Sequence, residues 1–425
     1  MTTTSIRFEP FEQAGRDRLF ETYEVLRNEA PVYRTESGYW VVSRYDDVRK
    51  VLLSPERFSS AAQQDEAFGL STTLDPNADP EAMAKLMAIV SAIPVDVGEL
   101  LQSRIIIGAD APDHTRIRRI VVRGFTAKHI ARYEAKVKEI IAERLAGIET
   151  ATEFELVSQL AEPLPVQMIG DIMGVAPQDR HRIVDWSDRS TRACLGETRG
   201  TIEATQMLMG VLRDFGQYFV GQIESRRTDP KDDLISALVR AEESETLTTT
   251  EAVMFLLAVM EAGMETSTSL IGNMVLGLLR NPEQLRLLTD DPSLVANAVE
   301  EAGRRWSPVQ FFFRRATGDQ ELCGVTIPDG ETVMLMIGAA NTDPRHFGDS
   351  ADDFDIRRDT SSVLTFGTGP HFCLGAALGR LELRNALTAL LPHLSRFELS
   401  DEPLELQASC LAYGYERILL KARPA

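Results

Sequence analysis

Apolar residues recur every three to four positions along most of the chain, the spacing that gathers them on one face of an α-helix. This spacing predicts helices over residues 128–148, 160–172, 201–225, 232–242, 250–280, 293–306 and 374–392. Strand-like runs are short and lie toward the two ends, at 32–34, 39–42, 325–327 and 418–420. The pattern therefore predicts a mainly α-helical protein with small β-sheets.

One predicted helix, at 248–280, is apolar on every side from Ala252 to Met260. A helix that is hydrophobic all round is buried in the centre of a large protein. Thr248 and Glu251 have the spacing of a capping box at its start. We expect this helix to run through the core.

The middle of that helix is Glu261-Ala262-Gly263-Met264-Glu265-Thr266. Buried carboxyl groups need partners or protonation, and glycine inside a helix costs about 1 kcal/mol relative to alanine. One interpretation is structural: Thr266 bonds back to the carbonyl of Ala262, and Glu265 pairs with an arginine elsewhere. The other is functional: Gly263 lets a flat cofactor and a diatomic ligand approach, while Glu265 and Thr266 deliver protons.

A second informative run, Phe366 to Gly375, surrounds Cys373 with three glycines. Glycines at this density predict a tight turn whose free N–H groups point at something. A thiolate that accepts backbone hydrogen bonds is stabilised as an anion and can be an axial ligand to haem iron. The alternative is a buried structural cysteine, since free cysteine is often buried.

Composition narrows these possibilities. The chain has 425 residues, 44% of them hydrophobic, enough for a large core, and its net charge of −19 disfavours nucleic acid or an anionic membrane as a partner. Its four cysteines lie far apart without a C-x-x-C pair, which argues against a disulfide framework and a zinc site. The N-terminus does not resemble a signal sequence, no run approaches the ~18 apolar residues of a membrane helix, and no linker divides the chain. We expect one domain over 1–425 and a cytoplasmic location.

From about Tyr39 to its end, the chain resembles the cytochrome P450 superfamily, specifically its soluble bacterial members. The Cys373 run is similar to the family's haem-thiolate signature, and residues 262–266 resemble its oxygen-activating helix motif. Glu301-Ala302-Gly303-Arg304 resembles its E-x-x-R helix, and the three motifs have the family's order. The resemblance implies a cytochrome P450 fold, a single large domain enclosing haem b.

The resemblance also implies roles for individual residues. Cys373 would be the proximal ligand of the haem iron, Glu265 with Thr266 the catalytic acid–alcohol pair, and Glu301 with Arg304 a structural ion pair that supports the cysteine loop. The other haem-binding residues that it implies are His114, Arg118, Ala262, Gly263, Arg314, Phe366, Gly367, His371 and Gly375. Of these, the basic residues would bind the haem propionates.

The chain departs from the family's pattern at three positions. Val363 stands where relatives often have a further histidine for a propionate, so one anchor is expected to be missing. Gly303 stands inside the E-x-x-R helix where leucine is common, and close packing against a neighbour is the physical reason we can offer. Glu261 stands where relatives usually have a small or apolar residue that touches substrate.

Glu261 is the strongest indication of substrate. An acid in an otherwise apolar pocket is most easily retained if it pairs with a donor or cation on the ligand. The alternative is an internal salt bridge, for instance to Arg182 or Arg192. Other expected pocket residues are Ala258, Gln310, Phe311 and Leu411. Because Phe311, Phe312 and Phe313 are adjacent, at least one must point each way.

The region from about 59 to 110 is longer than in typical relatives and contains a predicted extra helix at 79–93. We expect this insertion to form part of a mobile lid over the haem, enclosing a fairly large hydrophobic substrate.

Electrons must come from another protein, because no G-x-G-x-x-G nucleotide-binding fingerprint is present. Arg116, Arg119 and Arg123 are predicted to lie opposite His114 on their helix and to form a basic stripe. By resemblance this helix runs along the proximal face, so we expect an acidic ferredoxin, supplied by a ferredoxin reductase, to dock there.

The leading hypothesis is a ferredoxin-dependent monooxygenase that uses O₂ to hydroxylate, epoxidise or demethylate a hydrophobic small molecule. The alternatives are a haem-thiolate peroxygenase that uses hydrogen peroxide and a haem sensor or carrier without turnover. The pair Glu265 and Thr266 argues against both, because neither needs the same delivery of protons.

Overall fold

The computed structural model describes residues 7–12, 16–67, 79–196, 198–243 and 247–424. The first α-helices are α1 (Leu19–Glu29), α2 (Tyr45–Leu52), α3 (Ala61–Ala67), α4 (Pro80–Ser91), α5 (Val97–Gln102) and α6 (Asp113–Val121). Next come α7 (Ala127–Ile130), α8 (Glu134–Arg144), α9 (Pro163–Met173), α10 (Arg180–Leu195), α11 (Ile202–Thr228) and α12 (Leu234–Glu243). The last are α13 (Thr249–Arg280), α14 (Pro282–Asp290), α15 (Val295–Arg305), α16 (Ile337–Asn341), α17 (Pro344–Phe347) and α18 (Ala376–Leu394).

The strands form three small sheets. They are β1 (Val32–Arg34), β2 (Trp40–Val42), β3 (Phe58–Ser59), β4 (Glu153–Glu155), β5 (Phe311–Ala316), β6 (Gln320–Leu322), β7 (Val325–Ile327), β8 (Thr332–Met336), β9 (Phe397–Leu399) and β10 (Leu419–Ala422). The largest sheet has the order β1-β2-β8-β5-β3, with β2 and β8 parallel and the other neighbours antiparallel. The others are β4-β10-β9 and the hairpin β6-β7.

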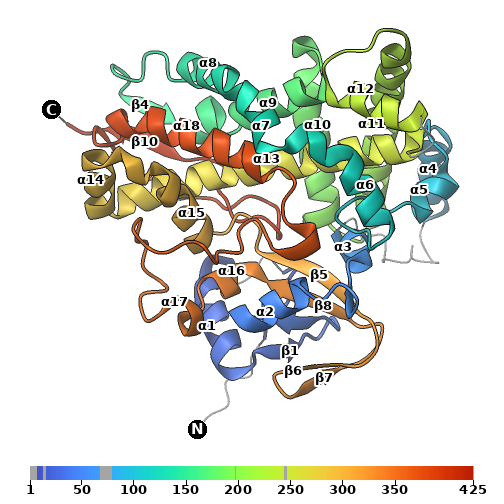
Figure 1. Ribbon diagram of the computed structural model, residues 1–425, viewed down its shortest axis with the longest axis horizontal. Helices are drawn as coiled ribbons and strands as arrows, with labels where there is room; N and C mark the ends of the chain where they lie inside the picture. The colour runs from blue at the N-terminus through green and yellow to red at the C-terminus, as the bar shows by residue number, and fades with distance from the viewer. Residues whose placement is uncertain (1–6, 13–15, 68–78, 197, 244–246, 425) are drawn as a thin grey trace.

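The helices and the largest sheet occupy different parts of the molecule. In Figure 1, α13 runs through the middle of the helical part, while β1, β5 and β8 gather with α1, α2 and α16 at the end that holds the N-terminus. Helices α9, α11, α15 and α18 pack against α13. The core helix is thus surrounded by other helices, as expected from its all-round apolar pattern.

The start of α13 is fixed by the predicted capping box, in which Thr248 and Glu251 bond reciprocally to each other's backbone N–H. By length and composition α13 could cross a membrane, but 61% of its most apolar window is buried inside the fold. Its apolar character is accounted for by its place in the core.

The structure confirms the helices predicted from periodicity, with shifted ends. The predicted helix at 128–148 is broken by a 3₁₀ turn and ends at Arg144, and the one at 374–392 runs on to Leu394. The prediction that strands lie toward the chain ends is wrong for β5 and β8, which form the centre of the largest sheet. β8 is short and nearly continuously apolar, and β5 is three phenylalanines followed by two arginines, so neither shows the alternation of apolar and polar residues that marks a strand in sequence.

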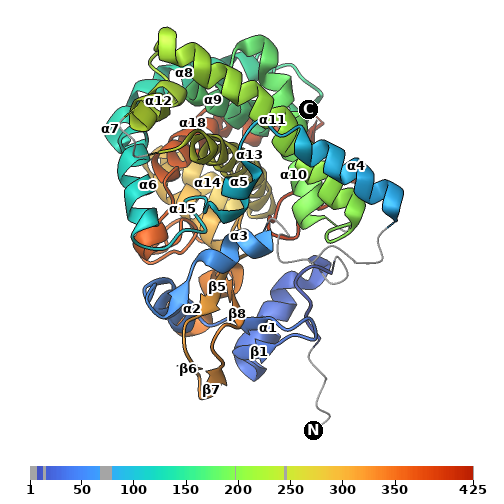
Figure 2. The same ribbon diagram turned by 90° about the vertical axis from the view of Figure 1, so that its right-hand side faces the viewer.

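The extra helix predicted at 79–93 is present as α4, capped by Asp79, whose carboxylate accepts from the N–H of Ala82. It packs along α11 (Figure 2), where the Gln206 amide donates to the carbonyl of Ala82 over 2.7 Å. Part of the predicted lid, residues 68–78, lies outside the described residues. The role of this region as a mobile lid stays a prediction.

Candidate active site

One face of α13 keeps accessible surface although the helix is in the core. From Ala252 to Leu278 every residue is buried except Ala258, Glu261, Ala262, Gly263, Glu265 and Thr266. Spacings of three and four residues place all of them except Gly263 on one side of the helix. We call Ala258, Glu261, Ala262, Glu265 and Thr266 the accessible stripe. Because α13 is enclosed by other helices, the stripe faces space inside the molecule.

Thr266 and Glu265 lie at the end of the accessible stripe. The Thr266 hydroxyl donates to the carbonyl of Ala262 over 2.8 Å, the back-bond that the structural interpretation expected. Burial raises the pKa of Glu265 to about 7, while a hydrogen bond from Ser409 and the charge of Arg16 oppose that rise. Glu265 can therefore hold or release a proton near neutral pH.

The arginine near Glu265 comes from the N-terminal segment. Arg16 donates to the carbonyls of Gln407 and Ala412 over 2.7 and 2.8 Å, which holds its charge beside α13. Nothing in the local sequence around Arg16 indicates this long-range approach.

Helix packing explains why glycine is needed at position 263. A Cβ at this position would overlap the Ile169 side chain of α9. We expected Gly263 to make room for a cofactor. That expectation is wrong, because the Cβ that glycine lacks would point toward Ile169. The glycine lets α9 approach α13 closely.

Glu261 has none of the arginine partners suggested from the sequence. Its carboxyl interacts with the Ser190 hydroxyl of α10, and its Oε1 is buried without a hydrogen-bond partner among the described residues. Burial raises the pKa of Glu261 to about 8, and the nearby Glu265 adds to the rise.

The cysteine loop has the tight turns predicted for it. Gly367 and Gly369 have φ of 69° and 72°, a region that favours glycine, and the N–H of Cys373 donates to the carbonyl of Phe366 over 2.8 Å. Cys373 keeps accessible surface, while many protein atoms surround its sulfur, to which the backbone N–H groups of Gly375 and Ala376 bond.

Two opposing effects act on the Cys373 thiol: nearby positive charges and N–H groups favour the thiolate, and burial favours the neutral thiol. Burial raises the pKa of the Cys373 thiol, while the Gly375 N–H, the charges of Arg118 and Arg380 and the Ala376 N–H oppose the rise. Arg380 is held with its guanidinium 4.3 Å from the Phe366 ring centroid and is paired with a carboxylate of α15. The sequence interpretation missed Arg380, which lies one turn into α18.

Four basic side chains gather beside the cysteine loop, as the resemblance implied: His114, Arg118, Arg314 and His371. The imidazoles of His114 and His371 have centroids 4.2 Å apart. Burial, reinforced by Arg314, His114 and Arg118, lowers the pKa of His371 to about 3. Burial also lowers the pKa of Arg314 to about 10. Burial also lowers the pKa of His114, so the positive charge of the cluster comes from Arg118 and Arg314.

Within the described residues no carboxylate forms an ion pair with this cluster. His114 Nε2 is buried without a partner, Arg118 donates to the carbonyl of Phe372, and His371 Nε2 lies 2.9 Å from the Ser60 hydroxyl. Asp110 acts on His114 and Arg314 through its charge without forming an ion pair with them. Buried donors without a partner are costly unless an anion binds to them. The cluster suits the two carboxylates of a haem. Val363, three residues before Phe366, is half-buried. That it stands where relatives have a further histidine for a propionate stays a prediction.

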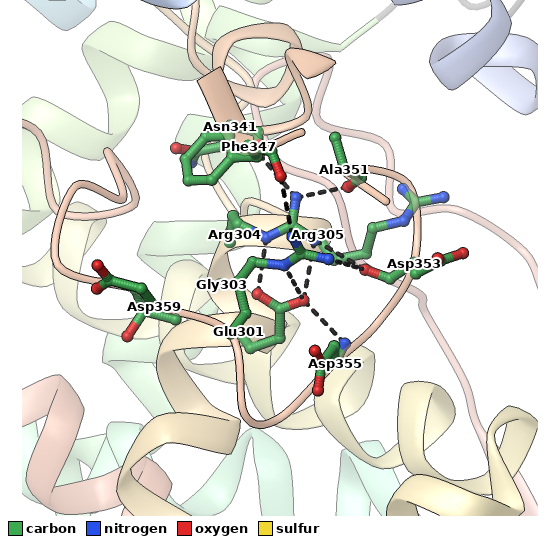
Figure 3. Close-up of polar contacts among 12 residues, drawn as sticks. Glu301, Gly303, Arg304, Arg305, Asn341, Phe347, Ala351, Asp353, Asp355 and Asp359 are labelled. Carbon is green, nitrogen blue, oxygen red and sulfur yellow. Dashed lines mark hydrogen bonds and ion pairs between the residues drawn. The ribbon is translucent and has the colours of Figure 1, made fainter. Parts of the chain in front are cut away.

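The pair Glu301 and Arg304 lies fully buried on α15. Arg304 Nε and Nη2 bond to the two oxygens of Glu301 at 2.7 and 2.9 Å (Figure 3). Arg304 also donates to the carbonyls of Asn341, Ala351 and Asp353. The pair therefore fixes the segment that precedes the cysteine loop.

Asn341 passes this support on to the loop. Its side-chain oxygen accepts from the N–H of Leu364 over 2.8 Å, two residues before Phe366. Gly303 contributes next to it, because a Cβ there would lie 2.8 Å from Cγ2 and 2.9 Å from Oγ1 of Thr365. The close neighbour suggested for Gly303 is therefore Thr365.

Two of the expected pocket residues are core residues. Gln310 is buried, accepts from the Tyr23 hydroxyl and donates to the carbonyl of Ser307. Phe311 is buried and stacks edge-on with Phe313, 5.4 Å between centroids. The pocket prediction is wrong for Gln310 and Phe311, because both side chains are fully engaged in the core.

The phenylalanine run alternates as predicted. Phe311 and Phe313 join one core cluster and Phe312 packs against another, because β5 has the two-residue period of a strand. Leu411 is half-buried beside the first cluster, and its carbonyl accepts from the N–H of Gln310. Ala258 lies on the accessible stripe, as expected for a pocket residue.

The predicted basic stripe is only partly free. Arg116 forms ion pairs with Glu251 at the start of α13 and with Asp113, so its charge is partly neutralised, and its inclusion in a docking face stays a prediction. Arg119 and Arg123 are exposed and make no ion pair within the described ranges. They border a groove of about 540 Å³ between α6, the turn after it and α12.

Comparison with known proteins identifies one family. The family model described as Cytochrome P450 matches residues 150–295 and 289–410. The vitamin D(3) 25-hydroxylase of Pseudonocardia autotrophica is 36% identical over 411 residues, covering 95% of this chain and 93% of the relative. The biotin biosynthesis cytochrome P450 of Bacillus subtilis is 32% identical over 391 residues, covering 90% of each.

Solved structures give the same result. CYP109E1 from Bacillus megaterium, in complex with testosterone, superposes with a TM-score of 0.81 at 30% identity and covers 97% of this chain and 100% of its own. P450BioI, in complex with hexadec-9Z-enoic acid ligated acyl carrier protein, has a TM-score of 0.81 at 29% identity, with 95% and 98% covered.

The fold, the thiolate loop and these matches define the class. The chain belongs to the cytochrome P450 family. It is a cytochrome P450 monooxygenase, and its family binds haem. Bacterial members take electrons from redox partners and oxidise hydrophobic substrates.

Proposed function

We propose that this protein uses haem b, with Cys373 as axial ligand, to insert one atom of O₂ into a hydrophobic small molecule that carries a basic or hydrogen-bond-donating group. Electrons come from a ferredoxin and its reductase, in the cytoplasm. The observation that carries the proposal is that one chain combines a glycine-rich cysteine loop, a cluster of basic side chains that forms no ion pair within the described residues, and an acid–alcohol pair. Relatives are named as a vitamin D(3) 25-hydroxylase and as a testosterone complex, both consistent with an apolar substrate.

The residues present fit haem at both of its polar ends. Cys373 offers a sulfur whose negative charge two backbone N–H groups and two arginines support. His114 and Arg314 offer buried donors to the propionates, with Arg118 and His371 beside them. When bound, haem supplies the iron at which O₂ is bound and cleaved.

The acid–alcohol pair supports oxygen activation over the alternative uses of haem. A carboxyl whose pKa is about 7 can give and regain protons at neutral pH, and Glu265 is next to the Thr266 hydroxyl in sequence and on the accessible stripe. The Thr266 hydroxyl donates its one proton to the carbonyl of Ala262 and keeps lone pairs that can accept another hydrogen bond. It can pass a proton on when the hydroxyl rotates away from that carbonyl. Neither a peroxygenase nor a haem carrier needs this delivery.

Thr266→Ala tests this assignment. We expect the variant to consume electrons and O₂ while product falls and hydrogen peroxide rises several-fold. Thr289→Ala is a matched control, since Thr289 makes the same back-bond, to Leu285 on α14, far from the stripe in sequence. Full coupling of electrons to product in Thr266→Ala would contradict the proton-delivery role.

The site proposed for the ferredoxin is the exposed pair Arg119 and Arg123. Reversing both to glutamate should slow reduction by an acidic ferredoxin at low ionic strength and leave substrate affinity unchanged, because opposite charges steer association. A control with Lys85→Glu and Arg286→Glu changes net charge equally on α4 and α14. Equal reduction rates in the two double variants would contradict this docking site.

A further inference from the structure

We propose that Glu261 anchors the substrate by binding a protonated amine, and that this cation is taken up together with the release of one proton. The inference rests on the proposed function, because it places the amine in the same interior site as Thr266. It narrows the substrate class to apolar molecules with one cationic nitrogen.

The first support is the position of Glu261 on α13. It belongs to the accessible stripe, whose other polar side chains are Glu265 and Thr266. Five residues separate Glu261 from Thr266, a rise of about 7.5 Å at about 1.5 Å per residue. An amine held at Glu261 therefore leaves the carbon near Thr266 several bonds away, so the nitrogen and the oxidised carbon are separated by a spacer.

The second support is that one oxygen of the Glu261 carboxyl lacks a hydrogen bond. Ser190 supplies one interaction to the Glu261 carboxyl, but Oε1 is buried without a partner in the part of the chain that the structure describes. A buried polar atom without a partner costs about 1–3 kcal/mol. A ligand donor that reaches this oxygen recovers that cost, so the site favours ligands that carry one.

The third support is that the neighbouring arginines are occupied elsewhere. Arg192 is paired with Asp188, with Nε 2.9 Å from both carboxylate oxygens. Arg182 lies with its guanidinium carbon 4.8 Å from the ring centroids of both Trp186 and Tyr218. No protein cation in the described ranges forms an ion pair with Glu261, so none competes with a cationic ligand for its carboxyl group.

Charged and titratable groups around Glu261 influence its protonation state. Glu265 faces it from the next turn of α13, and Cys194 faces it from α10, with Arg199 near that thiol. Arg16 acts on Glu265 rather than on Glu261. Burial and Glu265 raise the pKa of Glu261 to about 8, so at pH 7 the free site holds a neutral carboxylic acid.

Binding of a cation changes that protonation. A positive charge next to Glu261 favours the carboxylate, so the acid gives its proton to water as the cation enters. Between pH 6 and 8 the affinity for a permanent cation should rise by up to tenfold per pH unit. A neutral donor would leave the acid protonated and would show no such rise.

The test uses haem-loaded protein and alkylguanidinium ions with chains of eight to twelve carbons. These ions carry N–H donors, keep their charge below about pH 12 and do not ligate iron, so any pH dependence belongs to the protein. Each ion is compared with its neutral isostere, the alkylurea of the same chain length, which keeps N–H donors and lacks the charge. Binding is followed by the spin-state change of the haem, and proton release at pH 7 by calorimetry in buffers of different ionisation enthalpy.

We expect the ions to bind wild-type protein at least tenfold more tightly than their isosteres and to release close to one proton each. Glu261→Gln should abolish both effects. The matched control Glu203→Gln, an exposed carboxylate in the first turn of α11, removes the same charge and should change neither.

Equal binding of ions and isosteres to the wild type would overturn the inference, and so would an ion preference that survives Glu261→Gln. The proposed function fails in a different way, by loss of the thiolate spectrum of the CO complex. A normal CO spectrum without ion preference therefore rejects the amine anchor alone.

Discussion

Replacement of Gly303 by alanine tests how α15 supports the cysteine loop. The new Cβ would lie 2.8 Å from Cγ2 and 2.9 Å from Oγ1 of Thr365, a residue buried just before Phe366. Alanine gains about 1 kcal/mol over glycine inside a helix, but over-packing costs about 1–3 kcal/mol. Gly303→Ala should therefore lower the free energy of unfolding by up to about 2 kcal/mol.

The sign of the effect depends on Thr365. Thr365→Ala removes both clashing atoms, and Oγ1 has no hydrogen-bond partner among the described residues, so this change alone should cost only about 1 kcal/mol for the buried methyl group. In that background Gly303→Ala should stabilise the protein by up to about 1 kcal/mol. The double-mutant cycle then gives a coupling of about 1–3 kcal/mol.

Urea unfolding of the four proteins, followed by circular dichroism, measures this coupling. Gly221→Ala is the control, because Gly221 is exposed on α11 and nothing lies within 4 Å of an added Cβ. It should stabilise both backgrounds equally. If Gly303→Ala has the same effect with Thr365 and with alanine at that position, close packing is not the reason for the glycine.

Three further predictions concern the supports of the site. Arg304→Lys should lower the free energy of unfolding in urea by about 3–5 kcal/mol, because a buried ion pair and hydrogen bonds to carbonyls are lost. Arg357→Lys is the control and should be neutral, because Arg357 is exposed on the segment that Arg304 holds. The pKa of Glu382 is raised by burial to about 8, so the folded protein keeps a proton that the unfolded chain loses, and stability falls as pH rises toward 8. Glu382→Gln should reduce this fall, by at most about 1.4 kcal/mol per pH unit, and an unchanged pH profile would show that Glu382 does not titrate there. His114→Phe should speed haem transfer to an acceptor protein about tenfold, because a charged hydrogen bond is worth about 1.5–3 kcal/mol, and an unchanged rate would exclude His114 as a propionate donor.

Local patterns in the sequence predict much of this structure. The all-round apolar run and the capping box locate α13, and the glycines around Cys373 predict the positive φ values at Gly367 and Gly369. These features are local, so periodicity and turn chemistry suffice to find them. The same holds for α4, whose cap Asp79 precedes a proline and an apolar run.

Contacts between distant segments could not be predicted in the same way. Arg16 reaches Glu265 from about 250 residues away in sequence, and Arg116 is taken up by Glu251, because the fold brings these segments together. Gln310 is a polar residue beside an aromatic run, which suggests a pocket, but Tyr23 and Ser307 satisfy it in the core.

The central claim is that Cys373 binds haem iron as a thiolate, and the absorption spectrum of the reduced, CO-bound protein tests it most directly. We predict the red-shifted Soret band of thiolate ligation, lost in Cys373→Ser and retained in the buried-cysteine controls Cys194→Ser and Cys410→Ser. A Soret band of the kind given by histidine-ligated haem in the wild-type protein, or a red-shifted band that survives Cys373→Ser, would contradict the claim.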